Sequence, residues 1–529
     1  MPQLDPTRRG PTTLSPAVRR NNLARLGSEE FDLLVIGGGI NGAGIARDAA
    51  LRGLRVALIE KGDFASGTSS RSSKLIHGGL RYLELGDFRL VREACLERDR
   101  LRRYVAPHLV KPIPFLFPVY RGDPVGIFRL EVGMWVYDLL AAFRNIRMHR
   151  LLSPKRVAEL EPGLQQAQLK GAELYYDCAT DDARLTLETI LGASGAGAVV
   201  ANYVRLLELV KDGGRITGAE IRDERGAGRY TIHARVVVNA TGPWVDEVRR
   251  LDNPAVVPCL RLTKGAHIVV PRSRVDNRFA VVLRAPRDGR ILFVIPWDDR
   301  TLIGTTDTDF TGSPDTVSVD PEDVEYLLEA VNAFYPHARL VRSDVVGSFA
   351  GLRPLVAPED ARNPSAVSRE ERILSSPSGL VTLAGGKLTT FRAVAATVTD
   401  HIIGQLGGKP TRRRRRHHKV PLAGGTAHKN GRWRVEADRL EQRYGERAPE
   451  VMALMQERAD LSHPLVAGMP YTRGEAVYAV QAEMALDAED VLRRRTPMAM
   501  RDQAAASKAA EEVKALVDTL VRNSDSKLS

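Results

Sequence analysis

The chain has 529 residues, of which 43% are hydrophobic and 27% charged, and these values are typical of a folded globular protein with a large core. Its three cysteines lie far apart, which argues against a disulfide framework, a structural zinc site and a cysteine-ligated iron–sulfur cluster and favours a reducing cytoplasm. No apolar run reaches the roughly 18 residues that a membrane-spanning helix needs. The net charge of +12 is unevenly distributed, with one arginine-rich segment at the N-terminus and another at 412–416.

Residues 1–29 form the first arginine-rich segment and are predicted to be a basic, flexible tail. Its cations are Arg8, Arg9, Arg19, Arg20 and Arg25. The segment has no hydrophobic stretch, so it is not a secretory signal. Two interpretations stay open: a mitochondrial transit peptide, which would be equally rich in arginine and poor in acids, and a disordered N-terminal tail of a bacterial protein.

Residues 33–60 carry a complete dinucleotide-binding signature. An apolar strand at 33–36 runs into the glycine turn 37–42, a helix of small residues follows, and a second strand at 56–59 ends in Glu60. The glycines allow close approach of a pyrophosphate, whose charge is met by the amides at the helix N-terminus, and Glu60 is placed to accept hydrogen bonds from a ribose. We therefore predict that the dinucleotide is bound by Gly37, Gly39, Ile40, Asn41, Gly42 and Glu60.

Between residues 67 and 183, hydrophobic periodicity and proline content indicate the local structure. The polar segment 67–74 leads into 75–82, and apolar residues near helical spacing predict a helix from Phe88 to about Tyr104. The prolines between residues 105 and 120 indicate irregular chain. Further on, Asp182 is predicted to cap a helix that begins near residue 183.

The stretch 127–143 is the most apolar helical segment, but charged residues interrupt it. Our first interpretation is an amphipathic helix packed on the core of the protein. The alternative is that its apolar face lies in a membrane interface. That face consists of Val132, Trp135, Val136 and Leu139.

Two further strands also end in glycine turns, one at 234–239 before Ala240 and Gly242, the other at 380–384 before Gly385 and Gly386. Between them, 267–270 and 291–295 suggest an antiparallel sheet in a separate lobe. Three separated glycine turns indicate one long cofactor held at several points, which favours FAD over a nicotinamide. A helix predicted at 387–403 would place its N-terminal amides where they stabilise negative charge on a reduced flavin.

The predicted fold is α/β, with a Rossmann-like FAD-binding domain interleaved with an antiparallel-sheet substrate domain and followed by a helical cap. The oxidoreductase domain spans 30–408, with FAD-binding segments near 30–104, 180–250 and 345–408. Residues 409–420, which include Arg412–Arg416, are predicted to be a basic linker, with contact to anionic lipid as a second interpretation. Nucleic acid is not expected, because no aromatic-rich motif accompanies the arginines. Residues 421–529 form the predicted helical C-terminal domain.

Several long motifs make the chain recognisable. They are IGGGINGAGIARDAALRGL, TSSRSSKLIHGGLRYLE, VNATGPWV, KGAHIVVP, FVIPW, IGTTDTDF, GLRPL, AGGKLTTFR and YAVQAEMALDAEDVLRRRT. In these motifs the chain resembles the FAD-dependent glycerol-3-phosphate dehydrogenases of the aerobic, respiratory bacterial type. The resemblance implies oxidation of sn-glycerol 3-phosphate to dihydroxyacetone phosphate, FAD as cofactor, and electron transfer to a membrane quinone by a protein peripheral to the inner face of the plasma membrane. The calcium-binding loops of the mitochondrial relatives are missing, and a homodimer is a further expectation.

The same motifs supply candidate substrate contacts. A phosphate dianion needs fixed cations, and Arg81, Arg353 and Lys387 lie in the most specific motifs. Tyr82 and Thr389 are expected to bind substrate beside them, and Arg353 and Lys387 are counted among the catalytic residues. Removal of the proton from the C2 hydroxyl needs a base, for which we favour His267.

The remaining cofactor contacts are expected from the same motifs, with His77 beside the flavin. They are Ser70, Lys74, Leu75, Ile76, His77, Ala240, Gly242, Gly386 and Leu388. No metal site is predicted. Two rival functions stay open: a related flavin oxidase that uses oxygen or an amino-acid substrate, and a flavoprotein with structural FAD whose basic segments bind nucleic acid or a membrane.

Overall fold

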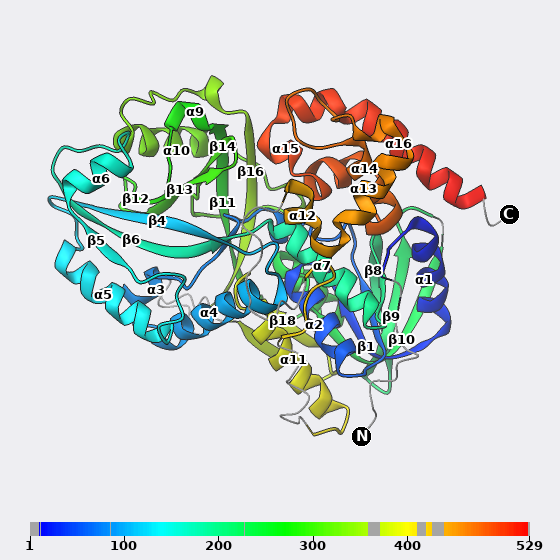
Figure 1. Ribbon diagram of the computed structural model, residues 1–529. Helices are drawn as coiled ribbons and strands as arrows, with labels where there is room; N and C mark the ends of the chain where they lie inside the picture. Colours follow the sequence, from blue (N-terminus) through cyan, green and yellow to red (C-terminus); the bar gives the residue numbers. More distant parts are fainter. Residues whose placement is uncertain are drawn as a thin grey trace.

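Two large sheets organise the chain, and the computed structural model describes residues 10, 12–84, 86–226, 228–357, 371–409, 419–425 and 438–526. One sheet lies at the lower right of Figure 1 and the other at the left, with the C-terminal helices above and to the right. The predicted α/β class with a helical C-terminal part is confirmed.

The first sheet has the strand order β17-β18-β10-β1-β2-β7, with β9 and β8 continuing from β10. Strands β18, β10, β1, β2 and β7 run parallel. The bounds are β1 Glu30–Ile36, β2 Val56–Ile59, β7 Val199–Ala201, β8 Val204–Asp212, β9 Arg215–Asp223, β10 Arg229–Asn239, β17 Arg372–Ser375 and β18 Val381–Ala384. Parallel strands are buried on both faces, which explains the continuous apolar runs.

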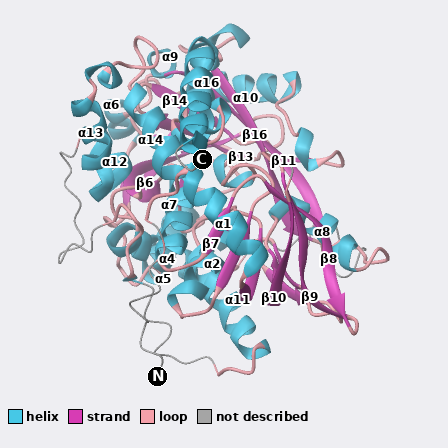
Figure 2. Cartoon of the chain, turned by 90° about the vertical axis from the view of Figure 1, so that its right-hand side faces the viewer, coloured by secondary structure: helices cyan, strands magenta, loops and turns pink. Residues whose placement is uncertain are grey.

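Helices α2 (Ile40–Leu51), α7 (Asp182–Gly195) and α11 (Phe391–Gln405) cover one face of this sheet. The other face is covered by the β8–β9 hairpin, α1 (Pro16–Ser28) and α8 (Val245–Asp252). In the turned view of Figure 2, β8, β9 and β10 lie to one side of α2 and α7. The carboxyl ends of β1, β10 and β18 therefore meet at one edge.

Helix α1 corrects the prediction that residues 1–29 are a flexible tail. Ser15 caps the helix, Pro16 begins it, and Leu23 and Leu26 are buried against the sheet. Arg19 is also buried, because it pairs with Asp223 at 2.5 Å. The capping pair Ser15-Pro16 was the missed signal, and residues 1–9 lie outside the described part of the chain.

The second sheet has the order β15-β11-β14-β13-β12-β4-β6-β3, with β16 paired to β11 and β5 to β6. Its pairs are antiparallel except for the short contact between β12 and β4. The bounds are β3 Leu75–Ile76, β4 Lys111–Tyr120, β5 Arg150–Leu152, β6 Leu169–Ala179, β11 Leu260–Pro271, β12 Ala280–Arg284, β13 Ile291–Trp297, β14 Arg300–Gly304, β15 Thr308–Asp309 and β16 Gly347–Val356. The predicted antiparallel segments lie in β11 and β13.

Strand β4 corrects the prediction of irregular chain between 105 and 120. It pairs with β6 from Lys111 to Tyr120 in spite of three prolines. Pro112, Pro114 and Pro118 are all even-numbered, so their missing N–H groups lie along the same edge of the strand and leave the other edge intact for pairing. Proline content alone was misleading, because the position of each proline in the two-residue period decides its effect.

One predicted helix is confirmed, and two helix starts differ from expectation. Helix α4 (Phe88–Arg100) is as predicted and continues as a π-helical turn to Val105. The N-cap of α7 is Asp181, whereas Asp182 is buried in a different role described below. Helix α11 begins at Phe391, so Lys387 precedes it by a turn and the predicted helix start at 387 is wrong.

The C-terminal region is helical, as predicted. Its helices are α12 (Arg439–Tyr444), α13 (Ala448–Glu457), α14 (Arg473–Glu483), α15 (Met498–Arg501) and α16 (Gln503–Ser526). None of the described helices has the length and apolar content required to cross a bilayer. Arg412–Arg416 lie outside the described residues.

Candidate active site

The first glycine turn is packed so closely that side chains cannot fit. Gly37 has a φ of +112°, and a Cβ there would lie 2.6 Å from the carbonyl oxygen of Ala240. A Cβ on Gly42 would lie 1.9 Å from the carbonyl oxygen of Gly37. The turn is thus fixed between β1, α2 and the turn after β10.

Gly42→Ala is expected to yield a protein without bound FAD. The added methyl group collides with the Gly37 carbonyl, which must shift and disrupt the turn. Gly404→Ala is the matched control, since nothing lies within 4 Å of its Cβ position in α11. The visible flavin absorbance per mole of purified protein measures the effect, and a yellow Gly42→Ala protein would refute it.

Glu60 at the end of β2 holds the same turn in place. Its Oε2 accepts a hydrogen bond from the Gly38 amide at 2.7 Å, and its Oε1 accepts one from the Gly62 amide at 2.9 Å. Burial raises the pKa of the Glu60 carboxyl, and these two amides oppose that shift. Glu60 also lines the cavity above the turn, where it can receive ribose hydroxyls.

Two cavities meet in the cleft between the two sheets. The larger, of about 390 Å³, is lined by α5 (Ile127–Leu140), β6, β13 and the end of β16. The second, of about 360 Å³, follows the three glycine turns. Both are lined by Thr68, Pro354, Gly386 and Lys387, so they form one continuous groove.

The residues of the second cavity fit FAD. Most of the predicted contacts line it, namely Gly37, Gly39, Ile40, Asn41, Glu60, Ala240, Gly242, Gly386 and Leu388. The Nδ2 of Asn41 donates to the Gly385 carbonyl at 3.2 Å, while its buried Oδ1 has no hydrogen-bond partner among the described residues. An orphaned acceptor beside glycine turns is what a hydrogen-bonding cofactor would satisfy.

Five other predicted cofactor residues are placed differently. Leu75 and His77 line the larger cavity rather than the second one. Ser70 and Ile76 are fully buried and line neither. Lys74 donates from Nζ to Asp182 at 2.5 Å in a buried ion pair, so its charge is neutralised within the protein. Contacts of Ser70, Lys74 and Ile76 with the cofactor stay predictions, since none of the three lines either cavity.

The predicted phosphate-binding cations converge at the junction of the cavities. Arg353 of β16 and Lys387 both line the larger cavity. Arg353 is held by donation from Nη1 to Asp307 at 2.9 Å and from Nη2 to the Thr305 hydroxyl at 3.0 Å. The Lys387 ammonium lies 4.1 Å from the centre of the Tyr82 ring. The side chain of Arg81 lies outside the described part of the structure.

His267 of β11 lies behind these cations and is only 3% exposed. Its Nε2 is 2.9 Å from the Ser73 hydroxyl, and its ring stacks on Phe349 at 4.9 Å. Burial first, and then the charges of Arg353 and Lys74, lower the pKa of His267 to about 3. The imidazole is therefore neutral near pH 7 and, without a bound anion, a weaker base than an ordinary histidine.

Because of His267, the free energy of unfolding should depend on pH. Since the pKa of about 3 lies below the ordinary value of 6.5, the unfolded state binds more protons between these values. The free energy of unfolding should consequently fall by about 2 kcal/mol through this residue between about pH 7.5 and about pH 5. In the His267→Gln variant the free energy of unfolding should fall less over the same pH range, and thermal unfolding at the two pH values measures the difference. An equal fall in both proteins would contradict a lowered pKa of His267.

Sequence reasoning missed several groups that surround the cluster. Ser73 contacts His267, and Thr305 contacts Arg353. Asp307 pairs with Arg353. All three stand in motifs that the sequence already singled out, but nothing local to those motifs indicates their partners. Thr389, a predicted substrate contact, accepts the amide of His77 at 3.1 Å through its hydroxyl.

The glycine-lined groove, the cation pair and the buried histidine define a FAD-dependent oxidoreductase. Residues 32–401 match the family described as FAD dependent oxidoreductase, and residues 398–527 match the C-terminal domain of alpha-glycerophosphate oxidase. The solved structure of the glycerol-3-phosphate dehydrogenase from Bacillus halodurans complexed with FAD is 31% identical, covers 97% of each chain and has a TM-score of 0.76.

Curated relatives agree with this likeness. The glycerol-3-phosphate dehydrogenase of Mycobacterium leprae is 39% identical over 92% of this chain and 84% of its own. The aerobic glycerol-3-phosphate dehydrogenase of Bacillus subtilis is 36% identical over 90% and 89%. The chain belongs to the FAD-dependent glycerol-3-phosphate dehydrogenases.

Proposed function

We propose that this protein oxidises sn-glycerol 3-phosphate to dihydroxyacetone phosphate. The observation that carries the proposal is that Arg353, Lys387 and His267 together line a third, smaller cavity of about 210 Å³, which shares Arg353 and Lys387 with the larger cavity. Two cations suit a phosphate dianion, and a neutral imidazole suits removal of a hydroxyl proton. The relatives named above make this substrate the first to test.

Arg353 and Lys387 bind and orient the phosphate. Asp307 and Thr305 fix the plane of the Arg353 guanidinium, so that little side-chain freedom is lost when its fork meets phosphate oxygens. Lys387 adds a compact charge from the other side, steadied by the Tyr82 ring. This arrangement presents C2 of the substrate toward the second cavity.

His267 takes the proton from the C2 hydroxyl. Bound phosphate offsets the positive charge of Arg353, one of the causes that keep the pKa of His267 low, and thereby favours proton transfer to its ring. Ser73 holds the imidazole in orientation through its hydroxyl. When bound, FAD supplies the two-electron oxidising power and receives the hydride that leaves C2.

The direct test is reduction of the flavin in the absence of oxygen. Addition of sn-glycerol 3-phosphate to the yellow protein should bleach the visible flavin absorbance, whereas glycerol should not. A flavin that stays oxidised with sn-glycerol 3-phosphate would contradict the proposed substrate. After admission of air, the amount of peroxide formed per turnover distinguishes a dehydrogenase from an oxidase.

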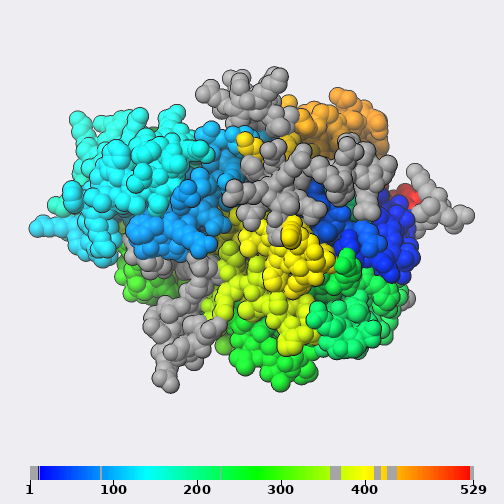
Figure 3. All heavy atoms as spheres, turned by 90° about the horizontal axis from the view of Figure 1, so that it is seen from below, coloured from blue at the N-terminus to red at the C-terminus, as the bar shows by residue number. Residues whose placement is uncertain are grey.

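We further propose a membrane quinone as electron acceptor, reached through helix α5. This helix exposes an apolar face that includes Phe128, 80% exposed, and Leu139, 61% exposed. The cyan segment containing α5 forms the end of the molecule opposite the blue N-terminal residues (Figure 3). On its inner side, Leu130 lines the larger cavity. An interfacial helix would thus bring lipid-dissolved quinone next to the substrate site.

Flotation with vesicles containing anionic lipid tests this surface. The double variant Phe128→Glu and Leu139→Glu should lose binding and quinone reduction while its flavin is still bleached by substrate. Val257→Glu is the control, because Val257 is equally apolar and 78% exposed but lies outside α5. Unchanged flotation of the double variant would show that α5 does not form the membrane surface.

A homodimer remains a prediction that sedimentation would check.

A further inference from the structure

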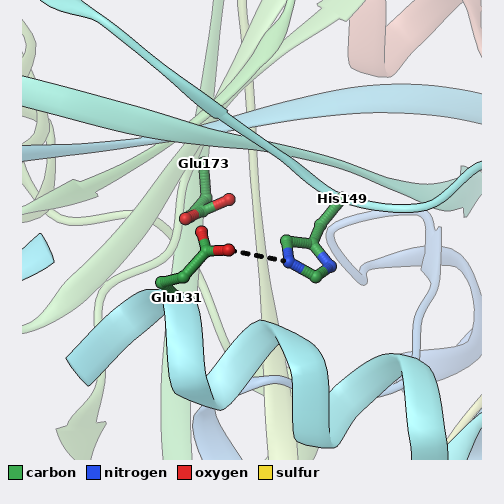
Figure 4. A group of neighbouring side chains, drawn as sticks. All are labelled: Glu131, His149 and Glu173. Carbon is green, nitrogen blue, oxygen red and sulfur yellow. Dashed lines mark ion pairs between the residues drawn. The ribbon is translucent and has the colours of Figure 1, made fainter. Parts of the chain in front are cut away.

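Three potential metal ligands gather on the second sheet, away from the Arg353 cluster. Glu131 comes from α5, His149 from the loop that enters β5, and Glu173 from β6. One ligand atom from each lies within 4.8 Å of the other two. Figure 4 shows the two carboxylates and the imidazole pointing toward one another.

Glu173 carries the first argument for a bound cation. The residue is completely buried, and neither carboxylate oxygen has a hydrogen-bond partner among the described residues. Glu131 also has a buried oxygen, Oε2, without such a partner. An unpaired buried carboxylate is strongly unfavourable, and a cation would remove the penalty.

The orientation of the His149 ring also favours a bound cation. Its Nδ1 lies 2.6 Å from Oδ2 of the buried Asp138. Donation to that carboxylate leaves the lone pair on Nε2, which faces Glu131 Oε1 at 3.4 Å. A carboxylate that orients a histidine in this way is the usual second partner of a metal-bound imidazole.

We propose that Glu131, His149 and Glu173 bind a divalent transition-metal cation of the zinc type, with Asp138 as a positioning residue. One imidazole nitrogen with two carboxylates matches the preference of Zn²⁺, whereas Ca²⁺ and Mg²⁺ prefer oxygen ligands alone. No sequence pattern predicts this site, because its ligands are separated by irregular spacings on a helix, a loop and a strand.

A cation at this site would connect α5 to strand β6 of the second sheet. Glu131 lies on the same helix as Leu130 and Gly133, which line the larger cavity. Trp135 lies on the next turn, and its Nε1 donates to Glu131 Oε1 at 3.1 Å. A cation bound to Glu131 and Glu173 would therefore hold the wall of the substrate cavity at a fixed distance from β6. This inference is independent of the proposed substrate.

The test is metal binding by the FAD-loaded, full-length protein after treatment with a chelator. Titration with Zn²⁺ alone should show one equivalent bound, and Co²⁺ should quench tryptophan fluorescence because the Trp135 ring lies 4.9 Å from that of His149. Trp135→Phe should lose this quenching. Absence of stoichiometric binding to the wild-type protein would overturn the proposal.

Variants locate the bound ion. Glu173→Gln and His149→Asn should abolish Zn²⁺ binding, and Asp138→Asn should weaken it by about 10- to 100-fold. His463→Asn is the control, since His463 is exposed in the C-terminal region. Thermal unfolding of the metal-free Glu173→Gln protein shows whether this variant remains folded. Should that variant fold poorly, Glu131→Gln, on the half-buried residue, gives the same test; retained affinity in these variants would refute the site.

Discussion

Replacement of Arg353 by methionine is expected to raise the KM for sn-glycerol 3-phosphate by about 100-fold while FAD stays bound. Methionine keeps the length of the side chain but removes the fork that meets the phosphate. Loss of one charged partner from a hydrogen-bonded ion pair costs about 3 kcal/mol, which corresponds to that factor. Steady-state kinetics with an artificial electron acceptor measures the change. The flavin content should match that of the wild type, because Arg353 does not line the second cavity.

Arg287→Met is the matched control for this experiment. Arg287 forms an ion pair with Glu329 on the surface, where its side chain is 58% exposed. Its replacement should leave KM unchanged. A normal KM in the Arg353 variant would remove this residue from the phosphate site, and with it the main support for the orientation of the substrate. A rise in KM in both variants would instead indicate a general electrostatic effect.

Asp63→Asn is expected to lower the free energy of unfolding by about 3–5 kcal/mol. Asp63 follows β2 and is buried, and it accepts hydrogen bonds from Arg494 Nε at 2.6 Å and Arg495 Nη2 at 2.9 Å. Both arginines belong to the C-terminal region. Asparagine would leave two buried guanidinium groups without their shared counterion, at the junction between this region and the FAD-binding sheet.

The pH dependence of this network has a definite sign. The two arginines lower the pKa of Asp63 to about 2 against the opposing effect of burial. Because the folded pKa lies below the ordinary value of 3.8, the stabilisation is present above about pH 4 and is lost as the pH falls toward 2. Thermal unfolding near neutral pH measures the Asp63→Asn effect. Asp315→Asn, which affects an exposed pair with Lys61, is the control and should change stability by less than about 0.5 kcal/mol; equal effects of the two would contradict the prediction.

The sequence by itself determined the FAD-binding turn, the fold class and the family. The turn from Gly37 to Glu60 could be predicted because its strand, glycines, helix and acid are close in sequence and each has a local physical cause. The antiparallel strands around His267 and Phe293 were likewise visible as apolar segments. Local signals were less reliable at the start of α7, where Asp181 rather than Asp182 is the cap. They also failed in β4, whose prolines lie along one edge and do not prevent pairing.

Which charged groups face the groove and which neutralise one another follows from the tertiary structure alone. Lys74 and Lys387 both stand in family motifs, yet Lys74 is paired with Asp182, whereas Lys387 lines the junction of the two cavities. Burial, pairing and distance determine what a charged side chain can do, and these arise from segments far apart in the chain. For the same reason Glu131, His149 and Glu173 become a candidate metal site only once α5 packs on β6.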